Sequence, residues 1–294
     1  MSSEGSCLGV CYADNHLYYS VNSPGLNGFL KHIGSIDFNF NVKNVVISGD
    51  PDGYPAVKSA LEKLKYQHKC SSVKMLSPAT EECWTIVPRS VYEHSEEREA
   101  HIALLMHGYG REKIETTWYP LSNADYKLLL LRNSEAMQGF KMLLGSFSHS
   151  EYVSEFEIGA DWQSHNQANG SFMMVHCMKD YISASSFILG KLRGCTYLKY
   201  ESATDLPYLW SLYSEKLTWM NGIYDEVRLF GYHSRIVAES LSPFLDDSGR
   251  VVVMNSLDEM NVNAKEKTYG FPIESAFPAI MMSLNLDSEQ TLPA

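Results

Sequence analysis

The sequence has few positive charges and no segment in which they gather. Its 294 residues include 24 Lys and Arg against 35 Asp and Glu, which gives a formal net charge of −11. Proteins that bind the phosphate backbone of nucleic acids do so through clustered cations, and attraction to anionic lipid surfaces needs similar clusters. The composition therefore argues against nucleic acid as a partner and against membrane-surface binding through basic residues.

Long hydrophobic runs are also missing. No window approaches the roughly 18 apolar residues of a membrane-spanning helix, and the opening MSSEGSCLGV lacks the basic and apolar regions of a signal peptide. The six cysteines are scattered, which in a long chain without a signal indicates reduced and mostly buried thiols. We expect a cytoplasmic protein that does not insert directly into a membrane.

Patterns that would hold a metal ion or a catalytic nucleophile are absent. The sequence contains no Cys-x2-Cys pair, no G-x-S-x-G and no H-E-x-x-H. Cys7 and Cys11 could be imagined as ligands together with His16, but core thiols are the better interpretation. The stretch GDPDG at 49–53 lacks the closing Glu of a calcium loop, because Leu61 stands there. We therefore expect no metal ion.

Strand and helix patterns alternate through the first half of the chain. Cys7–Ala13 and His16–Asn22 flank Asp14-Asn15, a pair suited to the positive φ angles of a two-residue hairpin turn. The patterns then predict, in order, a helix over Pro24–Ile33, a buried strand over Lys43–Ser48, a helix over Tyr54–Tyr66, strands over Ser72–Leu76 and Cys83–Val87, a helix over Ser95–Met106 ended by Gly108, strands over Glu115–Tyr119 and Tyr126–Leu131, and a helix over Ser134–Leu144 capped by Ser134.

The second half repeats this order of elements. The patterns predict strand-like material over Glu151–Ile158, strands over Phe172–Cys177, Tyr181–Leu189 and Thr196–Tyr200, a long helix over Thr204–Met220, a strand over Glu226–Gly231, a helix over His233–Leu245, a strand over Arg250–Met254 and a closing helix over Phe271–Leu286. Each half thus begins with an antiparallel hairpin and continues into alternating helices and strands. This order favours βα units on mixed sheets, and hence an α/β fold of two duplicated domains.

The domain boundary is expected in the stretch SFSHS at 146–150. We place the first domain at residues 1–148 and the second at residues 149–286. Residues 287–294 are expected to form a disordered tail.

Several stretches resemble a known superfamily. The segments LGVCYADNHLYYSV, ECWTIVPRSVY, DYKLLLLRNSEAMQGF, GSFMMVHCMKDYISASSFILGKL, DLPYLWSLYSEKL and DEVRLFGYHSR cover most of the chain in the expected order. In this order they resemble the actin/Hsp70/hexokinase-like superfamily (ribonuclease H-like domains in two lobes facing a nucleotide cleft). More narrowly, the chain resembles an uncharacterised family of bacteroidete proteins whose fold is akin to PilM, the actin-like pilus-assembly protein.

The resemblance implies a nucleotide site that this chain has largely lost. In active members the first hairpin carries Asp-x-Gly-Thr/Ser, whereas here Cys11 stands where the acid should be and Ala13 where the glycine should be. A Tyr and an Ala cannot replace a glycine cradle that lets the backbone approach phosphate. The second hairpin offers only Asp180 in a turn without glycine, and the adenosine-side turn offers the single glycine Gly231.

Four residues remain as candidates if a nucleotide such as Mg-ATP is bound. Asp14 and Asp180 lie in the two hairpin turns, Gly231 lies in the adenosine-side turn, and Ser234 begins a helix whose N-terminus could take an anion. No catalytic residue is assigned. The degraded signatures favour a protein without enzymatic activity and without a cofactor.

The aromatic residues suggest another role. The segment with Tyr208, Trp210 and Tyr213 forms either a core face or part of a partner groove, since Tyr and Trp are frequent at interfaces. The sequence therefore predicts a non-catalytic actin-like scaffold or adaptor that binds another protein, with a homodimer as a further form of association. The alternatives are a divergent ATP-binding kinase or ATPase of the same superfamily, and a module that binds a small ligand between its lobes.

Overall fold

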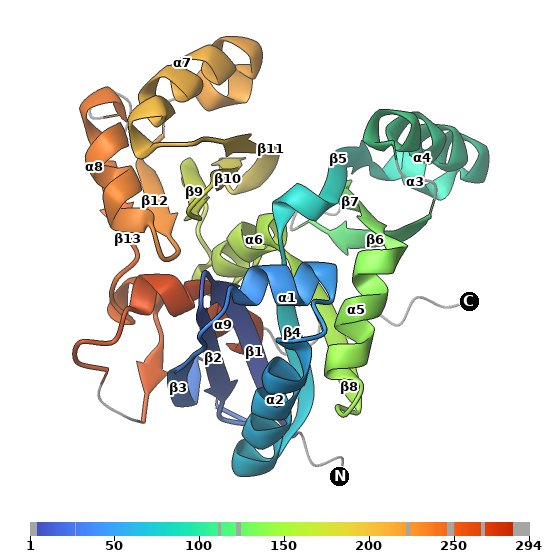
Figure 1. The fold of residues 1–294 in the computed structure, drawn as a ribbon. Coiled ribbons are helices and arrows are strands. Elements are labelled where there is room, and N and C mark those ends of the chain that lie inside the picture. Colours follow the sequence, from blue (N-terminus) through green and yellow to red (C-terminus); the bar gives the residue numbers. More distant parts are fainter. Residues whose placement is uncertain are drawn as a thin grey trace.

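A computed structural model describes residues 5–26, 28–110, 113–121, 125–221, 224–245, 250–265 and 268–284 (Figure 1). Within these ranges the chain forms two main β-sheets, one in each lobe, and a third, smaller sheet. None of the helices in the described part of the chain has both the length and the apolar character needed to cross a membrane.

The first lobe is built on a six-stranded sheet with the order β14-β3-β2-β1-β4-β8. Its strands are β1 (Ser6–Ala13), β2 (His16–Asn22), β3 (Phe29–Asp37), β4 (Cys70–Ser77), β8 (His149–Ser154) and β14 (Asn263–Ala264). Strands β1 and β2 form the predicted antiparallel hairpin, and β4 and β8 extend the sheet in parallel. One face packs on α1 (Val42–Ser48), α2 (Tyr54–His68) and α5 (Ser134–Leu144).

The second lobe repeats this topology. Its five-stranded sheet has the order β11-β10-β9-β12-β13, with the strands β9 (Phe172–Cys177), β10 (Tyr181–Ile188), β11 (Lys191–Lys199), β12 (Glu226–Phe230) and β13 (Arg250–Val253). If the strands of each sheet are numbered in chain order and the short β14 is left out, both sheets have the strand order 3-2-1-4-5. The helices α7 (Leu206–Lys216) and α8 (Ser234–Leu245) cover the outer face. The prediction of a two-lobed α/β fold with mixed sheets in duplicated domains is confirmed.

Two helices lie between the sheets and are almost entirely buried. All twelve residues of α9 (Ile273–Leu284) are buried, and so are the first nine of α6 (Glu155–Asn166). Helix α9 packs on β1 and β2 of the first lobe, while its Phe277 ring meets Phe230 of β12 at 4.5 Å. Both sheets therefore bury their inner faces on these shared helices.

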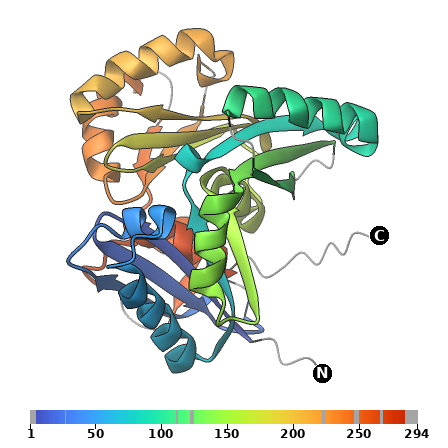
Figure 2. The same cartoon turned by 45° about the vertical axis from the view of Figure 1, so that its right-hand side comes forward.

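A third sheet, of order β5-β7-β6, is inserted between β4 and α5. Its elements are β5 (Glu82–Pro88), α3 (Arg89–Glu93), α4 (Ser95–Tyr109), β6 (Ile114–Pro120) and β7 (Tyr126–Asn133) (Figure 2). A buried ion network joins it to α6: Arg132 lies 2.7 Å from Glu82 and 3.5 Å from Glu157. Two carboxylates thus share one guanidinium in the core, where burial raises the pKa of Glu157 well above its ordinary value despite the nearby Arg132.

One strand prediction and one helix prediction were wrong in type. Lys43–Ser48 forms helix α1 instead of a strand, because the Asn41 side chain caps it and Val42, Val45 and Val46 place one helical face on the core. The helix predicted over Pro24–Ile33 is replaced by a turn at residues 24–25 and by the start of β3 at Phe29, and Gly25 and Gly28 adopt positive φ angles of 76° and 68° that a helix does not allow. Tertiary packing and turn chemistry override local propensity at both places.

Other predictions were wrong in extent. Glu151–Ile158 is a strand only to Ser154, whose side chain caps α6. The long helix expected over Thr204–Met220 is α7, flanked by the short 3-10 helices Ala203–Asp205 and Thr218–Asn221. The ends of three elements also move: α4 stops at Gly110 in place of Gly108, α5 is capped by Asn133 in place of Ser134, and β11 begins at Lys191.

The division into domains at residues 148 and 149 stays a prediction. Strand β8, which follows it, is hydrogen-bonded to β4 of the first lobe, and the late helix α9 packs on the same sheet. The chain therefore returns to the first lobe after passing through the second. The predicted tail at residues 287–294 lies outside the described residues.

Gly9 offers a direct test of the contact between β1 and α9. A Cβ at this position would overlap the backbone carbonyl of Ala279, which cannot move without displacing the buried helix. We expect Gly9→Ala to lower the free energy of unfolding by about 3 kcal/mol, as overpacking of a rigid core does. Urea unfolding measures this.

The matched control is Gly108→Ala in α4, where an added Cβ meets open space. It should leave stability unchanged or raise it by up to about 1 kcal/mol, since Ala is the better helix former. A Gly9→Ala protein as stable as this control would contradict the proposed close contact.

Candidate functional site

Three turns from different parts of the chain meet between the lobes. They are the β1–β2 turn with Asp14, the β9–β10 turn with Asp180, and the connection from β12 to α8 with Gly231. We call the place where they meet the seam and define it by Asp14, Lys43, Asp180, Tyr181 and His233.

Asp14 connects the first lobe to the start of α8. Its backbone has a φ of 49°, as the hairpin turn requires. The backbone carbonyl of Asp14 accepts a hydrogen bond of 2.7 Å from the Val42 amide and so holds the start of α1. Its carboxylate Oδ2 lies 3.6 Å from Nε2 of His233 in the second lobe. The carboxylate is therefore already directed at a group of this chain.

Asp180 is likewise engaged by the other lobe. Its carboxylate forms an ion pair of 3.1 Å with Nζ of Lys43 on α1, and the same Nζ lies 4.6 Å from the centre of the Tyr181 ring. The Lys43 side chain is 15% exposed and that of Asp180 is 65% exposed. The pair joins the two lobes across the seam. It also neutralises the Lys43 ammonium group, which is the cation that a phosphate would need at this point.

Gly231 and Ser234 form a tight connection into α8. Gly231 has a φ of 100°, and an added Cβ would lie 2.7 Å from the Cys177 carbonyl, so glycine is required. Its amide donates a 2.6 Å hydrogen bond to the carbonyl of Glu274 on α9. Ser234 is fully buried at the first position of α8. All four sequence-predicted candidates thus lie around the seam or directly behind it.

No pattern in the sequence indicates the most buried charge near the seam, Glu155. This residue begins α6, in a stretch predicted as a strand, and its carboxylate accepts hydrogen bonds from Tyr181 and from Ser183 at 2.6 Å. Nδ1 of His176 lies 3.2 Å from it. Burial alone would raise the pKa of Glu155, but His176 and the hydroxyl donors outweigh it and hold the pKa below its ordinary value.

Buried tyrosines surround this carboxylate. Tyr12 and Tyr181 are 3% and 0% exposed, and burial, followed by the charge of Glu155, raises the pKa of both phenols well above the ordinary value. The centre of the region behind the seam therefore consists of aromatic rings around a fixed negative charge.

No group of three or more His, Cys, Asp or Glu side chains with metal-site geometry occurs among the residues that the structure describes. Cys7 and Cys11 are buried thiols, as the sequence indicated. His16 instead directs Nδ1 at Asp37, 2.7 Å away.

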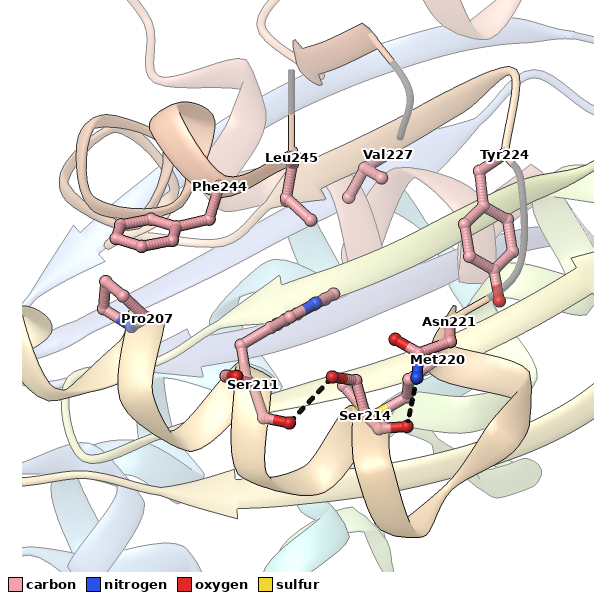
Figure 3. Close-up of a pocket in the computed structure, with 10 residues that line it drawn as sticks. Pro207, Ser211, Ser214, Met220, Asn221, Tyr224, Val227, Phe244 and Leu245 are labelled. Atoms are coloured by element: carbon pink, nitrogen blue, oxygen red, sulfur yellow. Dashed lines mark hydrogen bonds between the residues drawn. The ribbon is translucent and has the colours of Figure 1, made fainter. Parts of the chain in front are cut away.

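A pocket of about 270 Å³ opens on the outer side of the second lobe (Figure 3). It lies between α7 and α8, with Pro207 and Ser211 on one side and Phe244 and Leu245 on the other. Trp210 is 6% exposed and contributes to its lining, so the prediction of a core face holds for this residue. The rings of Tyr208 and Phe244, by contrast, are 69% and 61% exposed.

No family model matches the sequence, and no curated protein is similar to it in sequence. Solved structures are similar in fold. The structure of the PilM–PilN type IV pilus biogenesis complex matches with a TM-score of 0.69 over 95% of this chain and 97% of that one, at 14% identity. A Bacteroides thetaiotaomicron protein with an actin-like ATPase fold and unknown function matches with a TM-score of 0.54 over 88% of this chain and 95% of that one, at 17% identity.

These matches confirm the fold expected from the resemblance. The chain has a PilM-like, actin-like fold. At such low identity the likeness concerns the fold alone, so function depends on the residues of this chain.

Glu155 supplies a test of the buried charge. Because its folded-state pKa lies below the unfolded value near 4.5, its stabilisation is present above that pH and is lost as the pH falls through the folded value. We expect Glu155→Gln to cost about 2 kcal/mol at pH 7, as for a lost charged hydrogen-bond acceptor. The difference from the unsubstituted protein should shrink towards pH 4.

Urea unfolding at both pH values measures this difference. Glu135→Gln is the control, since Glu135 also stands in the first turn of a helix but its side chain is 72% exposed. A Glu155 effect that is independent of pH would show that the carboxylate charge is not what stabilises this region.

Proposed function

We propose that the protein is a non-catalytic scaffold or adaptor that binds another protein, on an actin-like fold with a degenerate nucleotide site. One observation carries this proposal: the carboxylates in the two hairpin turns each face a side chain of the opposite lobe across the seam. Lys43 pairs with Asp180, Asp14 faces His233, and the buried Glu155 carries a negative charge behind them. A nucleotide phosphate would have to displace these pairs and approach a like charge.

The comparison with PilM supports the binding of a protein partner. That structure is of a complex with PilN, so in that case a protein with this fold associates with another protein. The acidic surface of the present chain, with its net charge of −11, favours selectivity and solubility in such a role.

The pocket between α7 and α8 is our candidate contact point for the partner. Exposed aromatic rings at a pocket are the arrangement in which interface hot spots occur. Here Phe244 lines the pocket, and Tyr208 follows the lining residue Pro207 on α7. Neither ring is needed to anchor its helix, because α7 and α8 already bury Trp210 and Leu241 in the core of the second lobe.

A thermal-shift titration with Mg-ATP separates the scaffold from an ATP-binding enzyme. A ligand at a hundred times its Kd adds about 2.7 kcal/mol to the native state and raises Tm. We expect no rise at millimolar Mg-ATP. The opposite outcome is a rise in Tm that is lost in Asp14→Ala and kept in the exposed control Asp37→Ala. That outcome would establish nucleotide binding at the seam.

Substitutions at the pocket test the partner site. We expect Phe244→Asp and Tyr208→Asp to reduce recovery of the bound protein at least tenfold, since hot-spot residues contribute about 2 kcal/mol or more. The measurement is affinity purification from the native cell at low salt with quantitative mass spectrometry. Leu104→Asp on α4 is the matched control, because Leu104 is 71% exposed and lies on the third sheet's helix.

The two parts of this proposal fail separately. Equal recovery with all three variants would remove the pocket as the contact point but keep the scaffold. If no protein is retained above a tag-only control, the scaffold itself is wrong.

A further inference from the structure

Positive charges gather at one place in the described structure, the C-terminal end of α2, although the net charge of the chain is −11. Lys63 and Lys65 lie in the last two turns of α2, Lys69 is its C-cap residue, and Lys31 on β3 reaches the same end of the helix. We call Lys31, Lys63, Lys65, Tyr66 and Lys69 the basic patch. The expectation that positive charge does not gather is therefore wrong at this end of the first lobe.

Hydrogen bonds to backbone carbonyls hold two of the four ammonium groups in place. Nζ of Lys31 donates a 3.2 Å hydrogen bond to the His68 carbonyl, and Nζ of Lys65 donates to the Ser146 carbonyl in the connection from α5 to β8. These acceptors are neutral, and the C-terminal end of a helix carries only about half a negative charge. The two lysines are therefore positioned without losing the positive charge that they bring to the patch.

The other members of the basic patch are exposed. Lys63 and Lys69 are exposed, and Tyr66 is 77% exposed. Residues three apart on a helix are surface neighbours, so Lys63 lies beside Tyr66, and Nζ of Lys65 lies 6.0 Å from the centre of the Tyr66 ring. An aromatic ring thus stands among positive charges on one exposed surface.

Acidic side chains of the chain do not neutralise this surface. Among the described residues, no carboxylate forms an ion pair with a lysine of the basic patch, not even Glu62, the one acidic residue of α2. Elsewhere in the first lobe, Lys74 and Lys141 each pair with a glutamate. The positive charge of the patch is therefore available to a partner.

The size of the patch indicates which anionic partner fits. Nucleic acids and anionic membranes present long or flat arrays of phosphate and are bound by larger basic clusters. Such an array would extend over the acidic surface around the patch, where like charges repel within a Debye length of about 8 Å. A short acidic segment of a polypeptide covers the patch alone, and one of its side chains can also reach the Tyr66 ring.

The basic patch is also separate from the pocket between α7 and α8. Figure 1 shows α2 at the bottom of the first lobe and α7 at the top of the second lobe. A contact at the patch is therefore a different contact from the one at the pocket.

We propose that the basic patch docks a short acidic segment of the partner protein, with an aromatic side chain among its carboxylates. Carboxylates of the segment pair with Lys63 and Lys69, and its aromatic ring packs on Tyr66, in the manner of acidic-motif recognition by clustered cations. The inference rests on the proposed scaffold function, because it names the chemistry of a second contact with a protein partner.

Fluorescence anisotropy with the labelled peptide Glu-Glu-Glu-Phe-Glu-Glu-Glu tests this docking site. We expect saturable binding at 50 mM NaCl that weakens at 300 mM. The double variant Lys63→Glu with Lys69→Glu should raise Kd about tenfold, since two exposed ion pairs become repulsive contacts. Tyr66→Ser should raise Kd about threefold for this peptide, and should have no effect on the same peptide with Gly in place of Phe.

The matched control is Lys191→Glu with Lys216→Glu, which makes the same change in net charge at two exposed lysines of the second lobe. It should change Kd less than twofold. Thermal unfolding of both double variants checks that they fold equally well, as substitutions at exposed side chains should.

Three results would overturn the proposal. The first is no binding of the peptide, and the second is an equal loss of affinity in the two double variants, which would show only general attraction. The third is tighter binding of oligo-dT, of phosphatidylserine vesicles or of a second copy of the chain that is lost in Lys63→Glu with Lys69→Glu. None of these results bears on the affinity purification with the pocket variants, so the scaffold function and the docking site fail separately.

Discussion

The structure depends on the burial of α9 between the two sheets. This helix has no exposed face, and its backbone approaches β1 so closely that only glycine fits at position 9. Because α9 also contacts β12 through Phe277 and Phe230, and the connection to α8 through Glu274, its position fixes the second lobe relative to the first. One apolar segment near the end of the sequence thus unites strands formed from its beginning and its middle.

Charges buried around the other central helix add a second constraint. Helix α6 carries Glu155 at its first position and Glu157 two residues later, and the two carboxylates face different partners. Glu155 is held ionised by His176 and two hydroxyl donors, whereas Glu157 shares Arg132 with Glu82 and has a raised pKa. Since an isolated buried charge is strongly unfavourable, these networks determine how the third sheet and the second lobe meet α6.

The sequence was informative where a pattern is local. The hairpin around Asp14 followed from its turn residues, and the order of elements in the two halves led to the two-lobed fold. The strand predicted at Lys43–Ser48 was wrong because its β-branched residues pack as a helical face once the Asn41 cap is in place. Glu155 escaped notice for a related reason: its partners Tyr181, Ser183 and His176 lie more than twenty residues away, and only the fold brings them together.

The loss of the nucleotide signatures and the contacts at the seam concern the same hairpin turns. With Cys11 and Ala13 in place of an acid and a glycine, the first hairpin has no cradle for a metal ion or a phosphate. The charges that remain, on Asp14 and Asp180, would repel each other and Glu155 if left alone. Lys43 and His233 each face one of them from the opposite lobe. Lys43, which balances the charge of Asp180, is therefore also a side chain that links the lobes, and a phosphate could gain its positive charge only by separating this pair.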